Sequence, residues 1–111
     1  MNDKLKAIVE GIESKKGKDA VVLDLAGKNS VAEYFVICTG SSEPNLKAIV
    51  DEVEDKMEGL KETRLRIEGY NEGKWAILDY GDIMVHVFLE ETRKFYNLEN
   101  LWNQSEILYR G

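Results

Sequence analysis

The stretch WAILDYGDIMVHVF, residues 75–88, decides the fold of this chain. It is rich in β-branched and aromatic residues, which favour strands, and Gly81 near its middle favours a tight turn. We therefore predict a β-hairpin whose two loop residues are Tyr80 and Gly81. That register places Ile77 opposite Met84 across the two strands.

Both faces of the predicted hairpin carry mostly apolar side chains. A domain of this size can bury one such face easily, so the second face needs another explanation, and a protein partner is a good one. Side chains alternate between the two faces along a strand. Alternation assigns Leu78, Ile83, Val85 and Val87 to the core face, and Trp75, Ile77 and Met84, edged by Asp79 and Asp82, to the partner face.

Length and composition describe one ordinary domain with an acidic surface. The chain has 111 residues, 43% hydrophobic and 32% charged, and we expect a single domain over residues 1–111. The formal net charge of −6 disfavours direct binding to DNA or RNA and favours a basic protein partner. No run approaches the roughly 18 apolar residues of a membrane span, and the N-terminus lacks a signal-peptide pattern. We therefore expect no membrane partner and a cytoplasmic location.

Hydrophobic periodicity and turn residues predict the remaining elements. A crossover from the second strand through a helix favours an α/β fold, with a mixed β-sheet and helices packed against it. Aromatic residues such as Phe95 and Tyr96 are expected to close over the sheet. The predicted elements are a helix over 3–16, strands over 20–25 and 34–39 (the second central), a helix capped by Ser42 and ending near Gly59, an edge strand over 63–68, the hairpin, helical pieces over 90–96 and 98–102, and a loose tail over 103–111.

A Gly40-Ser41-Ser42 turn between a strand and a helix resembles the phosphate-contacting turn of nucleotidyltransferases. The signal is weak, because turns of this composition commonly cap helices. Nucleotidyl transfer also needs paired carboxylates on the following strand to hold Mg²⁺, and that strand offers only Glu68. We therefore predict that the chain is not an enzyme, with a nucleotide-binding or nucleotidyl-transferring enzyme as the minor alternative.

The single cysteine and the single histidine predict no metal site. Cys38 lies in an apolar run and is expected to be a buried core thiol. His86 lies within a predicted strand, where a structural or partner-facing role is more common than acid–base catalysis. One residue of each kind offers no cluster of ligands, so we expect neither a metal nor a cofactor.

Five short segments of the chain match a known family. Each segment alone is a modest signal, but the five together in this order are specific. They are YFVICTGSSE (34–43), EG (68–69), WAILDYGD (75–82), VHVF (85–88) and RKFYNLENLW (93–102). Through them the chain resembles the ribosomal silencing factor family, also called Iojap-like proteins. The resemblance covers about residues 3–102, nearly the whole chain.

The resemblance implies a nucleotidyltransferase-like fold without the catalytic carboxylates. It further implies a translational repressor that binds the large ribosomal subunit through ribosomal protein L-fourteen and blocks joining with the small subunit. Homodimers are also implied, and an assembly factor for the large subunit that uses the same surface is the alternative. The partner-binding residues expected from the hairpin face and the matched segments are Glu68, Trp75, Ile77, Asp79, Tyr80, Asp82 and Met84.

Overall fold

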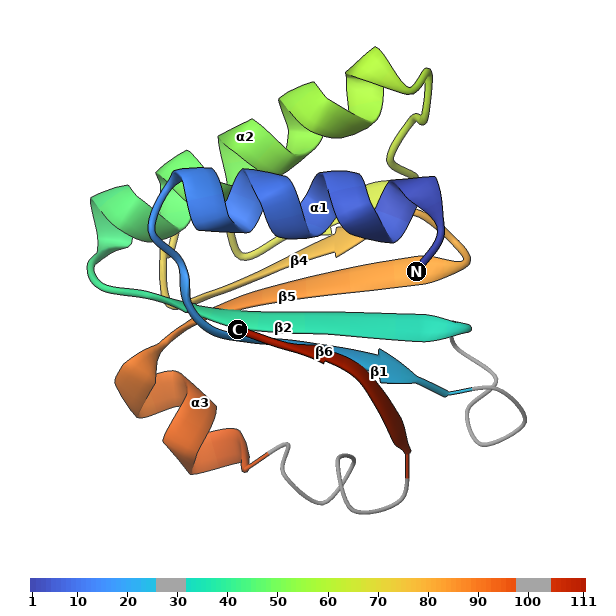
Figure 1. The fold of residues 1–111 in the computed structure, drawn as a ribbon. Helices are drawn as coiled ribbons and strands as arrows, with labels where there is room; N and C mark the ends of the chain where they lie inside the picture. The colour runs from blue at the N-terminus through green and yellow to red at the C-terminus, as the bar shows by residue number, and fades with distance from the viewer. Residues whose placement is uncertain (26–31, 98–104) are drawn as a thin grey trace.

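The chain folds around one mixed β-sheet, seen in a computed structural model that describes residues 1–25, 32–97 and 105–111. Figure 1 shows the helices on both sides of this sheet. The described elements are α1 (Asp3–Ser14), β1 (Lys18–Asp24), β2 (Tyr34–Gly40), α2 (Glu43–Gly59), β3 (Arg66–Glu68), β4 (Trp75–Asp79), β5 (Ile83–Leu89), α3 (Glu90–Tyr96) and β6 (Glu106–Arg110).

The strands lie in the order β3-β4-β5-β2-β1-β6, which confirms the predicted α/β fold with a mixed sheet. Strands β2 and β5 pair in parallel, and every other neighbouring pair is antiparallel. The apolar run of β2 is buried on both faces, as predicted for a central strand. The predicted edge strand is confirmed as β3, although it is only three residues long.

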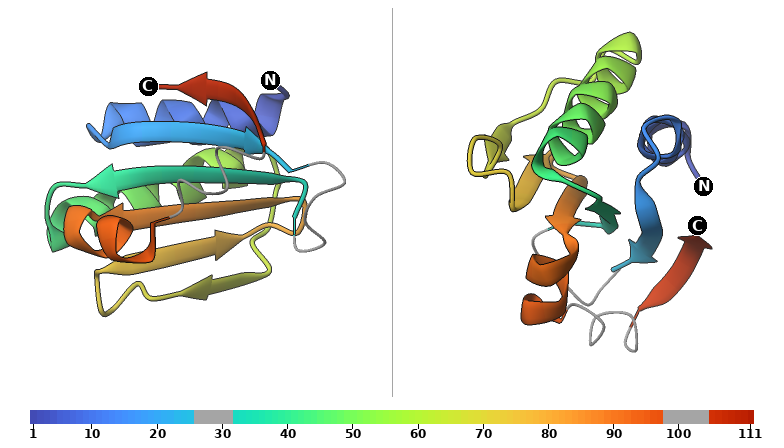
Figure 2. Two further views of the ribbon diagram at one scale, coloured as in Figure 1. Left: turned by 90° about the horizontal axis from the view of Figure 1, so that it is seen from below. Right: turned by 90° about the vertical axis from the view of Figure 1, so that its left-hand side faces the viewer.

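Two long helices, α1 and α2, cover one face of the sheet, whereas the short helix α3 lies on the opposite face (Figure 2, right). The Asn2 side chain caps α1 by accepting a hydrogen bond from the backbone N–H of Leu5. Ser42 caps α2 in the same way, with Pro44 in the first turn, as predicted. Both helices therefore begin at residues that satisfy their otherwise unpaired N–H groups.

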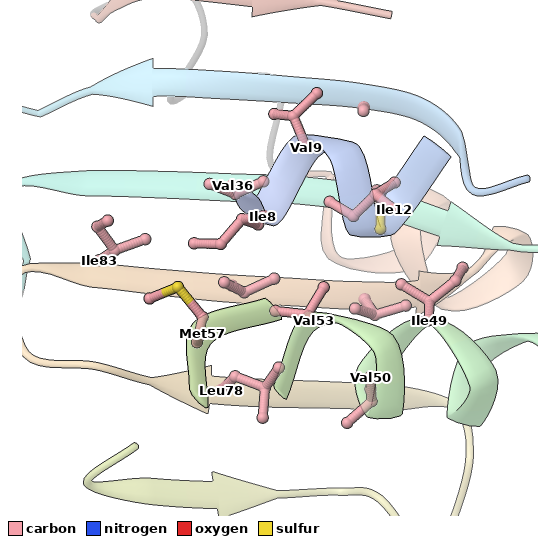
Figure 3. Close-up of a cluster of buried hydrophobic side chains, with 14 of the residues drawn as sticks. Ile8, Val9, Ile12, Val36, Ile49, Val50, Val53, Met57, Leu78 and Ile83 are labelled. Carbon is pink, nitrogen blue, oxygen red and sulfur yellow. The ribbon is translucent and has the colours of Figure 1, made fainter. Parts of the chain in front are cut away.

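The main core fills the space between these two helices and the sheet (Figure 3). The apolar stripes of the helices are fully buried, as expected for amphipathic helices on a sheet. Alternate residues of the strands, which point toward the two helices, pack against these stripes. Members of this cluster include Ile8, Ile12, Ile49, Val53 and Met57 from the helices, and Val36, Leu78, Ile83, Val85 and Val87 from the strands.

The predicted hairpin exists, but its predicted register is wrong by two residues. The backbone N–H of Tyr80 donates to the carbonyl of Ile83 at 2.9 Å, so the two loop residues are Gly81 and Asp82. Gly81 has φ +89°, and a two-residue hairpin turn needs a positive φ at its first loop position. Ile77 therefore pairs with His86, not with the residue two positions earlier. A shift by two preserves the alternation, so the predicted division into two faces is retained.

The C-terminal segment corrects the prediction of a loose tail. Residues 106–110 form β6, which pairs antiparallel with β1 and places Ile107 beside Leu23. The Tyr109 hydroxyl donates a hydrogen bond to Oε2 of Glu13 on α1 at 2.8 Å. The predicted helix over 90–96 is confirmed as α3, whereas the predicted piece over 98–102 lies outside the described residues. No helix in the described ranges is long and apolar enough to cross a membrane.

Candidate partner-binding surface

We call the sheet face that carries α3 the α3 face. It has its own hydrophobic cluster. Phe35 and Ile37 from β2 meet Met84 and Phe88 from β5 on this face. Met84 is only 6% exposed. The accessibility that we expected for Met84 is therefore not observed, because Met84 pairs with Phe35 of the neighbouring strand and lies in the same buried cluster.

Trp75 lies where this cluster meets the surface. Its indole ring is half-buried and stacks on Phe88 with ring centroids 4.8 Å apart and an interplanar angle of 24°. The ring of Tyr96 from α3 covers another part of it, with centroids 4.6 Å apart. The indole Nε1–H donates to Nδ1 of His86 at 3.2 Å. Trp75 is thus held by contacts with two aromatic rings and by one hydrogen bond.

Helix α3 presents two aromatic side chains to solvent. Phe95 is 82% exposed and Tyr96 is 51% exposed, and no residue of α3 is buried. Arg93 anchors the helix, because its Nη1 donates to Oγ1 of Thr39 at 2.8 Å and to the carbonyl oxygen of Asp19 at 2.9 Å. The expectation that Phe95 closes over the sheet is therefore wrong, whereas Tyr96 does contact the sheet through Trp75.

Acidic side chains border the aromatic residues on the β3 side. Glu68 of β3 is exposed and pairs with the half-buried Ile77 of β4. Two residue pairs further along, Arg66 lies opposite Asp79, with Nη2 and Oδ2 3.6 Å apart. The other Asp79 oxygen, Oδ1, accepts a hydrogen bond from the backbone N–H of Gly81 at 2.8 Å, so this carboxylate also stabilises the hairpin turn.

The predicted site residues therefore separate into two groups. Four of them share the accessible part of the α3 face, and with Phe95 and Tyr96 they form what we call the aromatic-acidic patch. Of the other three, Tyr80 and Met84 are buried and Asp82 is paired with Lys4. The patch consists of Glu68, Trp75, Ile77, Asp79, Phe95 and Tyr96.

Tyr80 and Asp82 lie away from the patch. Tyr80 is 8% exposed and packs in the main core, where burial raises the pKa of its hydroxyl to about 12. Asp82 accepts a hydrogen bond from Nζ of Lys4 at 3.0 Å, and the same ammonium lies 3.1 Å from Glu62. These two carboxylates raise the pKa of Lys4. Asp82 thus ties the hairpin turn to the start of α1.

The Gly40-Ser41-Ser42 turn has a packing explanation. A Cβ at Gly40 would lie 3.0 Å from backbone atoms of Leu46, so glycine lets α2 approach the strand closely. The N–H of Ser41 donates to Oδ1 of Asn45 at 2.9 Å, and the N–H of Asn45 donates to Oγ of Ser42 at 3.1 Å. These amides are therefore already paired within the chain and are not free to bind a phosphate.

A pocket of about 430 Å³ adjoins this turn, and its lining includes Asp19, Glu90 and Glu91 beside Lys18. Three carboxylates against one ammonium disfavour a phosphate group. Burial raises the pKa of the nearby Cys38 thiol to about 12, so the thiolate does not form near neutral pH. Within the described ranges, no group of three or more histidine, cysteine, aspartate or glutamate side chains is placed to hold a metal ion.

Sequence reasoning missed the exposure of Phe95 and the bond between Trp75 and His86. An aromatic pair flanked by charged residues, as in EETRKFY, is the signal that could have indicated a short exposed helix. The predicted register places Trp75 directly opposite His86, whereas in the structure Trp75 lies opposite Phe88 and Ile77 lies opposite His86. The bond therefore joins two side chains from neighbouring pairs on one face of the sheet.

Comparison with known proteins identifies relatives across almost the whole chain. The family model described as "Ribosomal silencing factor during starvation" matches residues 1–109. The chain is 37% identical to the ribosomal silencing factor of Bacillus subtilis over 109 residues, covering 96% of this chain and 92% of that protein. It is 31% identical to a mouse protein named "Mitochondrial assembly of ribosomal large subunit protein 1", covering 86% of this chain and 43% of that protein.

The fold agrees with a solved relative. A crystal structure of a protein from Chromobacterium violaceum superposes with a TM-score of 0.87 at 32% sequence identity, covering 93% of this chain and 88% of that chain. The α/β fold with a mixed sheet and its packed helices is therefore shared with an experimentally solved protein.

Proposed function

Because this chain belongs to the ribosomal silencing factor family, we propose that it represses translation by binding the large ribosomal subunit and blocking its joining with the small subunit. The contact we propose is with ribosomal protein L-fourteen, in the cytoplasm. A steric competitor needs only a well-fitting surface, so this function requires no catalytic group.

The observation that carries the proposal is the aromatic-acidic patch. Exposed aromatic side chains next to a half-buried tryptophan are the composition of a protein interface, where a few such residues carry most of the binding energy. The exposed carboxylate of Glu68 at its border suits a basic partner, which is typical of ribosomal proteins. The acidic net charge of −6 supports the same choice.

Co-sedimentation with purified ribosomal subunits tests the proposal. Wild-type protein should migrate with the large subunit and reduce the amount of joined ribosomes. Phe95→Ala should reduce both effects without changing the fold, because the side chain is 82% exposed. Leu60→Ala, at the C-terminal cap of α2 and 43% exposed, is the matched control and should behave like wild type. Migration with the small subunit alone would contradict the proposal.

A second function, assembly of the large subunit, is favoured by the name of the mouse relative. In assembly, the same patch would bind an immature large subunit. Removing the protein from growing cells separates the two functions. Accumulation of immature large subunits would indicate assembly, whereas normal subunits with excessive joining during starvation would indicate silencing. Light scattering of the purified protein tests the homodimer that the family resemblance implies.

We also propose that the chain has no nucleotidyltransferase activity. The paired amides of the Gly40 turn and the carboxylates beside it support this view. Incubation with each nucleoside triphosphate and Mg²⁺ or Mn²⁺ should release no pyrophosphate above a buffer blank. Release that disappears in a Glu68→Gln variant would show a real active site.

A further inference from the structure

The α3 face contains a histidine with one unpaired nitrogen. His86 is 5% exposed, and its Nδ1 accepts the indole N–H of Trp75 at 3.2 Å. A neutral imidazole that accepts at Nδ1 carries its proton on Nε2. Nε2 is buried and has no hydrogen-bond partner among the residues that the structure describes. The described part of the fold therefore leaves this buried donor unused.

Packing alone does not explain this histidine. The ring lies against Phe35 in an edge-on contact, with centroids 4.6 Å apart, and parallel to Phe88 at 6.1 Å. A phenylalanine at position 86 would suit such aromatic neighbours without burying an unpaired N–H, which is unfavourable. The hydrogen bond to Trp75 does not explain it either, because that bond uses Nδ1 and leaves the N–H on Nε2 without a role.

Access to His86 leads through the aromatic-acidic patch. The indole of Trp75 is bonded to the imidazole, and the ring of Tyr96 covers the indole with centroids 4.6 Å apart. Tyr96 is 51% exposed and belongs to a helix that has no buried residue. Changes of side-chain rotamer at an interface are common when proteins bind. A partner seated on the patch therefore reaches the imidazole by moving the rings of both Tyr96 and Trp75.

We propose that His86 is a specificity-determining residue whose Nε2–H donates a hydrogen bond to an acceptor oxygen of the protein bound at the aromatic-acidic patch. This inference rests on the proposed function, since it deepens the description of the same surface. A partner that offers an acceptor oxygen there completes the hydrogen bonding of His86, whereas an apolar surface leaves the donor unpaired. Sites that need a hydrogen bond reject partners that lack it strongly.

Three substitutions separate the roles of the two ring nitrogens. His86→Phe removes both nitrogens and keeps a ring of similar shape. His86→Asn keeps an acceptor close to the position of Nδ1 but has no group that reaches the position of Nε2. His86→Gln carries an amide N–H that reaches the region of Nε2. Each variant is measured in two ways, by urea unfolding and by titration with purified large ribosomal subunits.

His86→Phe should unfold at the same urea concentration as wild type or higher, yet bind large subunits about tenfold more weakly. His86→Asn should bind as weakly as His86→Phe, and His86→Gln should recover part of the affinity. Wild-type affinity in His86→Phe would overturn the proposal. Full recovery in His86→Asn would also overturn it, because His86 would then act only by positioning Trp75.

Two further outcomes are distinguishable. A His86→Phe protein that unfolds at lower urea than wild type would show that His86 is a packing residue, which contradicts the proposal. A wild-type protein that does not bind large subunits would overturn the proposed function itself, and with it the partner assigned to His86.

Discussion

The two faces of the sheet carry different kinds of side chain. On one face, the helices α1 and α2 seal a cluster of aliphatic side chains that are almost all fully buried. On the other, aromatic rings mix with His86 and with the bond from Arg93 to Thr39, and the short helix α3 has no buried residue. The first face thus holds the larger buried cluster, and the second retains the polar and exposed groups on which the proposed binding depends.

Truncation on the helix-covered face should have the largest effect. Leu78 is fully buried in the main core. Leu78→Ala should lower the free energy of unfolding by about 2–5 kcal/mol, since a cavity is left where the side chain packed. Urea denaturation measures this loss. A loss as large in Phe95→Ala, which should stay within about 0.5 kcal/mol, would remove the contrast between the faces.

Acid should weaken the α3 face through His86, the only histidine of the chain. Burial lowers its pKa from 6.5 to about 4, so the unfolded chain takes up this proton more readily than the folded one. This contribution to stability is complete above pH 6.5, falls as the pH drops, and is lost below pH 4. The whole loss is on the order of 3 kcal/mol, with about 2 kcal/mol gone by pH 5.

Urea denaturation at pH 7 and pH 5 measures this loss of unfolding free energy. The His86→Phe protein is the control, because it has no imidazole at position 86 and should not lose the part that comes from protonation of His86. Equal losses in both proteins would assign the acid sensitivity to carboxylates instead.

Truncation of the tryptophan should weaken both the binding of the large subunit and the stability of the fold. Trp75→Ala should weaken large-subunit binding about thirtyfold, which corresponds to roughly 2 kcal/mol for an aromatic anchor. It should also reduce stability, because the ring stacks on Phe88 in the cluster of the α3 face. Titration and urea denaturation of one preparation give both values. Unchanged binding by a folded Trp75→Ala protein would remove this residue from the interface.

Charge reversal at the border of the patch should have the smallest effect. Glu68→Lys should slow association with a basic partner several-fold at low salt and leave stability nearly unchanged, because Glu68 is exposed. The difference from wild type should shrink as salt rises. Glu58→Lys, also exposed but on α2, is the matched control. Stopped-flow association over a salt series measures the effect, and identical rates for wild type and Glu68→Lys would exclude an electrostatic role.

Local sequence patterns predicted the parts of the fold that local chemistry specifies. Ser42 and Pro44 marked the start of α2, and the unbroken apolar run of β2 marked a central strand. The prediction of the hairpin register was wrong because the observed turn uses Gly81 as its first loop residue and directs Tyr80 into the main core. Strand β6 was missed because its pairing partner β1 is almost the whole chain away, so no local pattern reveals the pairing.

The candidate site was predictable only in part. Alternation correctly placed Trp75 and Ile77 on one face, since it depends only on parity. The burial of Met84 depends on Phe35 from another strand, which becomes its neighbour through the parallel pairing of β2 and β5. The exposure of Phe95 depends on where α3 lies, and that is decided by the contacts of Arg93.

The pairing of β6 with β1 has a consequence for the newly made chain. Val21 pairs with Arg110, so one edge of β1 has no partner strand until residues 106–110 have been synthesised. An unpaired strand edge is a template on which another chain can add. Pairing with residues 106–110 covers this edge of β1, so a variant truncated before residue 106 should aggregate more readily than the chain that carries β6.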